Sequence, residues 1–131
     1  MHCVTVDQEI NRLWLTLGKV ESPDEIAQVM GKIIVACREL RPGFTCLTDL
    51  RQYELVDASQ ELFIRQMQQY LVKAGLGKVV RVVKKFKALG HIQFDLSSME
   101  VGYHAHHVYS IQEAVALLDE IFLDEWFEEE A

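Results

Sequence analysis

The sequence lacks the features that mark membrane-spanning, secreted and disulfide-stabilised proteins. None of its 131 residues belongs to an uninterrupted apolar run of the roughly 18 residues that a membrane-spanning helix needs. Its start, Met1 to Asp7, combines no basic region with an apolar one, so we expect no signal peptide. The cysteines Cys3, Cys37 and Cys46 are odd in number and widely spaced, which suits neither a disulfide framework nor paired metal ligands. We therefore expect a cytoplasmic protein with reduced thiols, in which Cys37 and Cys46 are small core residues.

Recognisable signatures of catalysis are also missing. The sequence contains no P-loop, no Gly-x-Ser-x-Gly elbow and no Gly-x-Gly-x-x-Gly run, and Gly75-Leu76-Gly77 is better explained as a helix stop before a strand. No internal repeat, low-complexity tract or interdomain linker is present. We expect a non-catalytic protein without a cofactor, built as one domain over residues 1–131, with a core at 4–122 and an acidic tail at 123–131.

Charge is present in ordinary amount but unevenly distributed. Half of the residues are apolar and a quarter are charged, as in a packed globular domain. The net charge of -7 argues against nucleic acid as the main partner. All charges from Glu113 onward are negative, whereas those from Leu62 to Phe94 are positive: Arg65, Lys73, Lys78, Arg81, Lys84, Lys85 and Lys87. These segments are either two solvated surfaces, or the acidic tail meets the basic segment of its own or a neighbouring chain.

The N-terminal half carries two strand signals, a helix and a third strand. Residues 3–7 and 12–17 are rich in β-branched and aromatic residues, which predicts a hairpin or two adjacent strands. The run Ser22-Pro23-Asp24-Glu25 predicts a helix start with a capping box, and Arg41-Pro42-Gly43 predicts its stop. Residues 44–50 predict a central strand covered on both faces. The apolar positions of the helix are Ile26, Val29, Met30, Ile33 and Cys37.

The C-terminal half repeats the alternation. A second helix is expected to take Asp57 as its N-cap and to end at Gly75 and Gly77. Residues 78–83 predict a strand, residues 84–99 are ambiguous, and residues 103–109 predict a last strand. Ser110 is expected to cap a final helix. The apolar stripes of the two helices are Phe63, Met67, Tyr70, Leu71 and Ala74, and Ile111, Ala114, Val115, Leu118, Ile121 and Phe122.

This alternation predicts an α/β fold. Strands separated by helices pair in parallel through right-handed crossovers. The expected order is β-β-α-β-α-β-α-β-α, a small mixed and largely parallel sheet of four to five strands with helices packed on it.

The order resembles the STAS fold, which anti-sigma factor antagonists share with the cytoplasmic tails of sulfate transporters, and the related SpoIIAA-like family. In STAS proteins a strand ends in Asp or Asn, an Asp-Ser-Ser-Gly turn follows eight residues on, and a helix begins. Here Asp49 precedes Asp57-Ala58-Ser59-Gln60 by eight residues, and residues 108–118 resemble the last strand and helix. The resemblance covers residues 4–122 and implies that Ser59 is the phosphorylatable serine, although Ala58 and Gln60 depart from the family's turn.

The residues Asp57 to Gln60 support two compatible interpretations. In the structural one, Asp57 accepts from an amide of the first turn and Gln60 closes a capping box. In the functional one, the Ser59 hydroxyl lies beside free amides at the positive end of the helix, where a phosphate gains hydrogen bonds. Asp49, Asp57, Ser59 and Gln60 thus form the predicted surface for a partner protein or a small anionic ligand.

Two further segments carry candidate chemistry. His104 and His106 share one face of the last predicted strand and could bind zinc or nickel, but a third ligand is needed, and the alternative is an exposed strand with half-buried histidines. The sequence neighbours that could complete such a site are His91, Asp95 and Glu100. The basic cluster Lys84, Lys85, Phe86 and Lys87 lies among apolar residues. It predicts contact with a hydrophobic ligand or an anionic membrane, or ordinary core packing with snorkelling lysines.

The sequence thus predicts a non-catalytic cytoplasmic interaction or regulatory module that acts through Asp49, Asp57 and Ser59. The alternative is a SpoIIAA-like binder of a small hydrophobic ligand or lipid, held between the sheet and residues 86–99. A metal protein or enzyme built on the histidines is the third hypothesis. A homodimer could form through Trp126, Phe127 and the acidic tail, or through an edge strand.

Overall fold

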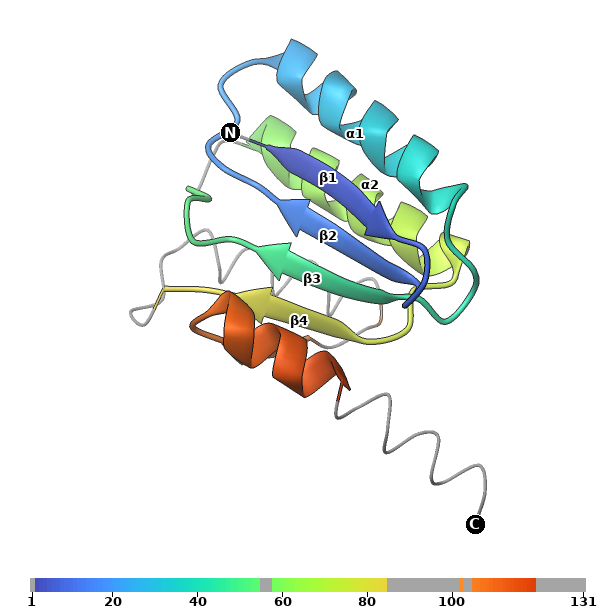
Figure 1. Ribbon diagram of the computed structural model, residues 1–131. Helices are drawn as coiled ribbons and strands as arrows, with labels where there is room; N and C mark the ends of the chain where they lie inside the picture. Colours follow the sequence, from blue (N-terminus) through green and yellow to red (C-terminus); the bar gives the residue numbers. More distant parts are fainter. Residues whose placement is uncertain (1, 55–57, 85–101, 103–104, 120–131) are drawn as a thin grey trace.

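One mixed sheet of five strands organises the protein. The computed structural model describes residues 2–54, 58–84, 102 and 105–119 (Figure 1). In the described part the strands lie in the order β1-β2-β3-β4-β5, with β1 antiparallel to β2 and every later neighbour parallel. The predicted α/β class with a largely parallel mixed sheet is therefore confirmed. The strands are β1 (Cys3–Asp7), β2 (Arg12–Thr16), β3 (Thr45–Asp49), β4 (Val79–Val82) and β5 (His106–Val108).

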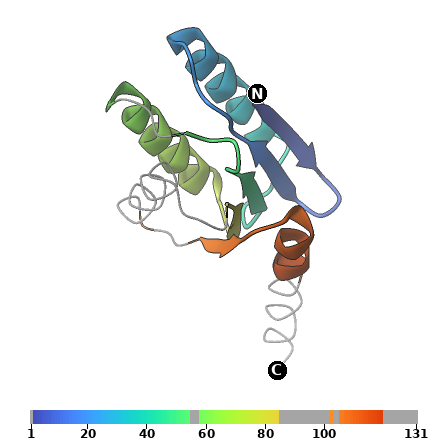
Figure 2. The same cartoon turned by 90° about the vertical axis from the view of Figure 1, so that its left-hand side faces the viewer.

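Helices cover both faces of this sheet. Helices α1 (Pro23–Cys37) and α2 (Ala58–Ala74) pack on one face, whereas the helix at residues 111–119 packs on the other (Figures 1 and 2). The sheet is therefore the middle of three layers, as the predicted central strand requires. The helix expected between β4 and β5 falls on residues outside those described. Side chains of the two cores include Leu13, Leu15, Ile33, Phe63 and Met67 on the first face, and Leu47, Val80, Val82, Ala114 and Leu118 on the second.

The predicted helix starts are confirmed at two serines. The Ser22 Oγ accepts a hydrogen bond from the Glu25 amide at 3.3 Å, and the Glu25 carboxylate accepts from the Glu21 amide at 2.6 Å. The Ser110 Oγ accepts from the Glu113 amide at 3.1 Å, and the Glu113 carboxylate accepts from the Tyr109 amide. In both helices the glutamate thus bonds the amide one residue before the serine, which ties the incoming chain to the first turn.

The predicted stop of α2 is also confirmed, and it has a second physical cause. Gly75 adopts φ +106°, which favours glycine because a side chain would clash with the backbone. The Gly43 amide donates to the Gly75 carbonyl at 2.6 Å, and the Gly77 amide donates to the Phe44 carbonyl at 2.8 Å. The loops that enter β3 and β4 therefore touch backbone to backbone, and a Cβ on Gly75 would lie 2.7 Å from the Pro42 Cα.

The cysteines follow the expected pattern only in part. Cys46 is buried in the core beneath α1 and α2, whereas Cys37 is half-buried and Cys3 is exposed. Burial raises the pKa of the Cys46 thiol to about 11, although a hydrogen bond with Thr48 and the charge of Arg81 oppose the increase. Cys46 is therefore protonated at neutral pH and is not a nucleophile. Among the described helices, none is both long enough and apolar enough to cross a bilayer.

Candidate functional site

The carboxyl edge of the sheet gathers the predicted recognition residues that the structure describes. Thr16, Asp49, Val82 and Val108 are register neighbours at the ends of four adjacent strands. Beyond them the chain turns into α2 on one face after β3, and into the helix at residues 111–119 on the other face after β5. In open α/β sheets, ligands commonly bind outside the carboxyl ends of the strands.

Asp49 and Arg51 form a closed pair directly after β3. The Arg51 amide and Nε donate to Asp49 Oδ1 at 3.1 and 3.0 Å, and Arg51 Nη2 donates to Oδ2 at 2.9 Å. The Asp49 side chain is 14% exposed, whereas that of Arg51 is 41% exposed. The aspartate therefore holds a guanidinium at the surface in one orientation instead of offering a free carboxylate.

The turn that follows packs against the beginning of α2. The Tyr53 side chain is buried in the core beneath α1 and α2. Burial raises the pKa of its hydroxyl, and the nearby carboxylate of Glu61 in the first turn of α2 raises it further. Ser59 lies in that first turn, as the sequence predicted for a strand-to-helix connection. Asp57 lies outside the described residues, so its role as N-cap stays a prediction.

Acidification is expected to destabilise the wild-type protein more than an Asp49→Asn variant. Burial alone would raise the pKa of Asp49, but the hydrogen bonds from Arg51 outweigh it and hold the pKa below the ordinary value of 3.8. A carboxyl group with a lower pKa in the folded state contributes stability above its unfolded pKa and loses it as the pH falls through the folded value.

Urea denaturation between about pH 5 and pH 2 measures this difference. The free energy of unfolding of the wild-type protein should fall more steeply below about pH 4 than that of Asp49→Asn. Arg51→Met should also flatten the curve because it removes the two side-chain hydrogen bonds to Asp49 and keeps only that of the backbone amide. Parallel curves for all three proteins would contradict the role of the Asp49–Arg51 pair.

Arg81, one of the basic residues that were predicted to lie on a solvated surface, is buried instead. Arg65, Lys73, Lys78 and Lys84 are exposed, which fits a solvated basic surface, but Arg81 is only 1% exposed. Arg81 is the register neighbour of Thr48 on the face that α1 and α2 cover. The valines on both sides of Arg81 were the available signal, because a strand in the middle of a three-layer sheet has no solvent face. Arg81, Thr48 and Gln68 of α2 are the buried polar side chains of this face.

A second buried cation joins the two ends of the chain. Arg12 Nη2 donates to Asp119 Oδ1 at 2.9 Å, and Arg12 Nε donates to Thr45 Oγ1 at 3.0 Å. The Arg12 side chain is 4% exposed and that of Asp119 is 58% exposed. The predicted contact joined the acidic C-terminal residues to the basic segment from Leu62 to Phe94. Asp119 instead contacts Arg12, which lies outside that segment. Beside the pair is a hollow of about 440 Å³ at the amino edge of the sheet, which Asn11, Arg41 and Gly43 help to line.

Among the residues that the structure describes, no group of three or more His, Cys, Asp or Glu side chains lies close enough together to hold a metal ion. His106 and His107 are both exposed on β5 and, as consecutive strand residues, point to opposite faces. His104 and the other proposed ligands, His91, Asp95 and Glu100, lie outside the described residues. A metal site that includes them stays a prediction.

The basic cluster after β4 is only partly described. Lys84 is exposed and lies two residues after the end of β4, as Arg51 does after β3, so both lie at the same edge. Lys85, Phe86 and Lys87 lie outside the described residues. The predicted contact of this cluster with a hydrophobic ligand or a membrane therefore stays a prediction.

Comparison with known proteins does not identify a relative. No protein-family model matches the sequence, and no curated protein is significantly similar to it. The resemblance to STAS and SpoIIAA-like proteins therefore stays a prediction that rests on residues 49–60 and 108–118.

Proposed function

We propose that the protein is a non-catalytic interaction module that recognises an anionic group, a phosphate or a carboxylate on a partner protein, at the carboxyl edge of its sheet. The Asp49–Arg51 pair carries this proposal. It orients a guanidinium at the edge where α/β proteins bind ligands, and it uses only the Nε and Nη2 groups for that purpose. The remaining N–H groups of Arg51 can donate to a second anion in a planar, charge-assisted arrangement.

The start of α2 adds a second attractive feature to this edge. The first amides of a helix have no intrahelical acceptor and lie at the positive end of its dipole. The Tyr53 side chain is buried in the same core cluster as Phe63 and Ile64 of α2, which holds the turn after Arg51 near this helix. Lys84 adds a positive charge at the same edge. Ser59, in the first turn, is the residue that a kinase would modify if the resemblance to STAS proteins holds.

Titration of isotope-labelled protein with inorganic phosphate at low ionic strength, followed by NMR, tests the proposal. We expect shifts of the amides at 49–51, 58–61 and 84. Arg51→Gln should weaken phosphate binding about tenfold, because a charge-assisted hydrogen bond is lost. The matched control is Arg38→Gln, since Arg38 is an exposed arginine at the C-cap of α1. Absence of localised shifts, or equal binding by both variants, would reject the anion site.

The alternative function, binding of a hydrophobic molecule between the sheet and residues 86–99, falls largely on residues outside those described. The apolar hollow of the described part lies elsewhere, between β1 and α1, and exposed residues such as Gln28, Lys32 and Val35 line it. It is therefore a surface groove and not an enclosed ligand cavity. No observation favours the alternative over the anion site.

A further inference from the structure

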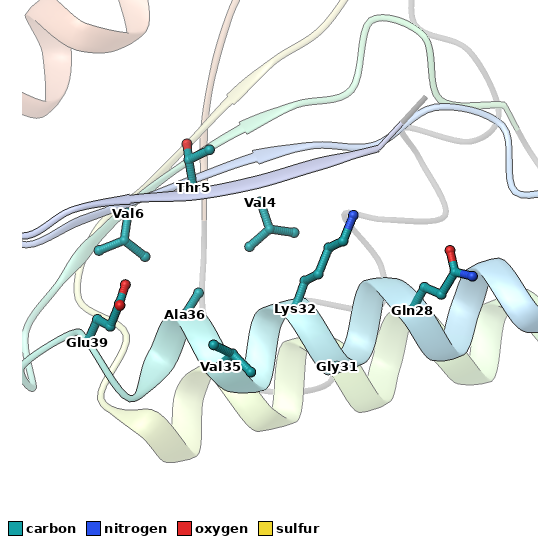
Figure 3. Close-up of a pocket in the computed structure, with 9 residues that line it drawn as sticks. All are labelled: Val4, Thr5, Val6, Gln28, Gly31, Lys32, Val35, Ala36 and Glu39. Carbon is teal, nitrogen blue, oxygen red and sulfur yellow. The ribbon is translucent and has the colours of Figure 1, made fainter.

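The groove between β1 and α1 has an apolar wall and lies beside the outer edge of the sheet. It has a volume of about 740 Å³. Val4 and Val6 point from β1 toward α1, and Val35 on α1 is 56% exposed although it is a large apolar side chain (Figure 3). α1 packs against β1 and α2 and extends beyond the outer edge of β1 (Figure 1). The place where one more strand would extend the sheet is therefore covered by α1 on one face.

The outer edge of β1 presents the backbone groups of two valines. Directly after β2, the Leu17 amide donates to the Asp49 carbonyl of β3 at 3.1 Å. Because backbone groups alternate in direction along a strand, the odd-numbered residues of β2 bond to β3 and the even-numbered ones bond to β1. The odd-numbered residues of β1 lie opposite these even-numbered residues. The amides and carbonyls of Val4 and Val6 therefore point away from β2, and no segment in the described part of the chain pairs with them.

β1 has none of the sequence devices that keep edge strands from pairing. Its five residues include no lysine and no proline, and its one charge, Asp7, is at the end. The Asp7 carboxylate accepts from the amides of Glu9 and Ile10 and so belongs to the turn that follows. All five residues pair with β2 in an uninterrupted register, so no bulge bends the strand away. Such an edge is a template for another strand.

We propose that the groove binds an extended segment of a partner protein, which adds a strand antiparallel to β1 and places two apolar side chains against α1. Residues directly opposite each other in paired strands share a face, so the residues opposite Val4 and Val6 point toward Val35. The segment therefore has two apolar residues with one residue between them. Antiparallel pairing is the more stable arrangement per residue, and main-chain hydrogen bonds to a sheet edge supply the affinity. A second folded copy does not fit this place through its own β1, because its α1 would overlap α1 and α2.

Charges along α1 define the chemistry of the segment further. α1 runs in the same direction as β1, with Lys32 near the Val4 end of the groove and Glu39 near the Val6 end (Figure 3). Within the described residues neither Lys32 nor Glu39 forms an ion pair of its own. An antiparallel segment enters at the Glu39 end and leaves at the Lys32 end. It therefore carries a basic residue before the two apolar residues and an acidic residue after them, all four on the α1 face.

Calorimetric titration with the end-blocked peptide Lys-Thr-Val-Thr-Val-Thr-Glu tests the proposed pairing. In this register its third and fifth residues lie opposite Val6 and Val4, with their amides directed at β1. N-methylation of these two amides should weaken binding at least about tenfold, because their hydrogen bonds are lost. The matched control is N-methylation of the fourth and sixth residues, whose amides point away from β1. This control should bind like the unmodified peptide.

Hydrogen exchange followed by NMR locates the peptide on the protein. In the free protein the amides of Val4 and Val6 should exchange quickly, whereas the amide of Thr5 should be protected by its bond to β2. Addition of the peptide should slow exchange at Val4 and Val6 and leave Thr5 little changed.

Exchange of charges and loss of the apolar wall test the contact with α1. The wild-type protein should bind the peptide about tenfold more tightly than its reversed sequence, Glu-Thr-Val-Thr-Val-Thr-Lys. The double variant K32E/E39K should prefer the reversed sequence, because every contact then joins opposite charges again. Val35→Asp should weaken binding of the first peptide, whereas the matched Val72→Asp, at a 40% exposed valine on α2, should not. Circular dichroism shows whether each variant is folded.

Four results would overturn the proposal. Absence of binding at high micromolar peptide concentration means that the groove does not accept a strand of this chemistry. Equal effects of the two N-methylation patterns would show that the peptide does not pair with β1. An unchanged preference of K32E/E39K would separate the peptide from Lys32 and Glu39. Slow exchange at Val4 and Val6 in the free protein would show that another segment, or another copy, already pairs with this edge. Each result is independent of phosphate binding at Arg51.

Discussion

Replacement of Gly75 by alanine should lower the free energy of unfolding by about 2–4 kcal/mol. Two costs act together. The residue has φ +106°, a conformation in which an L side chain is strained, and the new Cβ would lie 2.7 Å from the backbone Cα of Pro42. Relief of the clash would separate the loops before β3 and β4 and stretch the hydrogen bond from the Gly43 amide to the Gly75 carbonyl.

Urea denaturation of Gly75→Ala and of a matched control, Gly31→Ala, measures this effect. Gly31 lies within α1, and a Cβ there meets nothing within 4 Å. Alanine at this position should raise the free energy of unfolding by about 0.5–1 kcal/mol, because glycine is a poor helix former. A neutral Gly75→Ala substitution would contradict the close backbone packing of the two loops.

Removal of the Asp119 carboxylate should destabilise the protein more than removal of its partner Arg12. Asp119→Ala leaves the Arg12 guanidinium, whose side chain is 4% exposed, without its carboxylate. We expect a loss of about 2 kcal/mol, below the full cost of breaking a buried pair because Asp119 itself is largely solvated. Arg12→Met removes the buried charge, keeps most of the apolar volume and leaves a solvated Asp119. Its expected loss is about 1 kcal/mol or less.

Denaturation curves of the two single variants and of Arg12→Met/Asp119→Ala test this asymmetry. In the double variant the cost should be smaller than the sum of the single costs, because Asp119 has no buried charge to neutralise once Arg12 is gone. Equal and additive losses of unfolding free energy would contradict the role of Asp119 in stabilising the buried charge of Arg12. Helix content from circular dichroism reports whether the helix at residues 111–119 remains formed.

The helix starts show how much of the fold was predictable from local chemistry. Ser22 with Glu25 and Ser110 with Glu113 act within four residues of each other, so their pattern is visible in the sequence and both helices begin where it predicted. The strand at residues 44–50 was predicted as central because its apolar residues do not alternate with polar ones, and both of its faces are covered. Such signals depend on hydrogen-bond geometry and on burial of consecutive side chains.

The candidate site was predictable only in outline. The turn after β3 and the helix at Ser59 follow from the sequence, which placed Asp49 on the recognition surface but gave no sign of its pairing with Arg51. The structure pairs it with Arg51, and in this pair the guanidinium is more exposed to the solvent than the carboxylate. The groove between β1 and α1 was not predicted at all, because the exposure of Val35 depends on how far α1 extends beyond the edge of the sheet.

The sequence by itself determined the α/β class, the hairpin, the positions of both serine caps and the glycine stop of α2. Each of these depends on residues that are close along the chain, where a few hydrogen bonds or one backbone conformation decide the outcome. The tertiary structure alone decided that Arg12 meets Asp119 across 107 positions, and that Arg81 is buried between β3 and β5. These depend on which faces the layers cover, since long-range packing and desolvation of charge have no local pattern in the sequence.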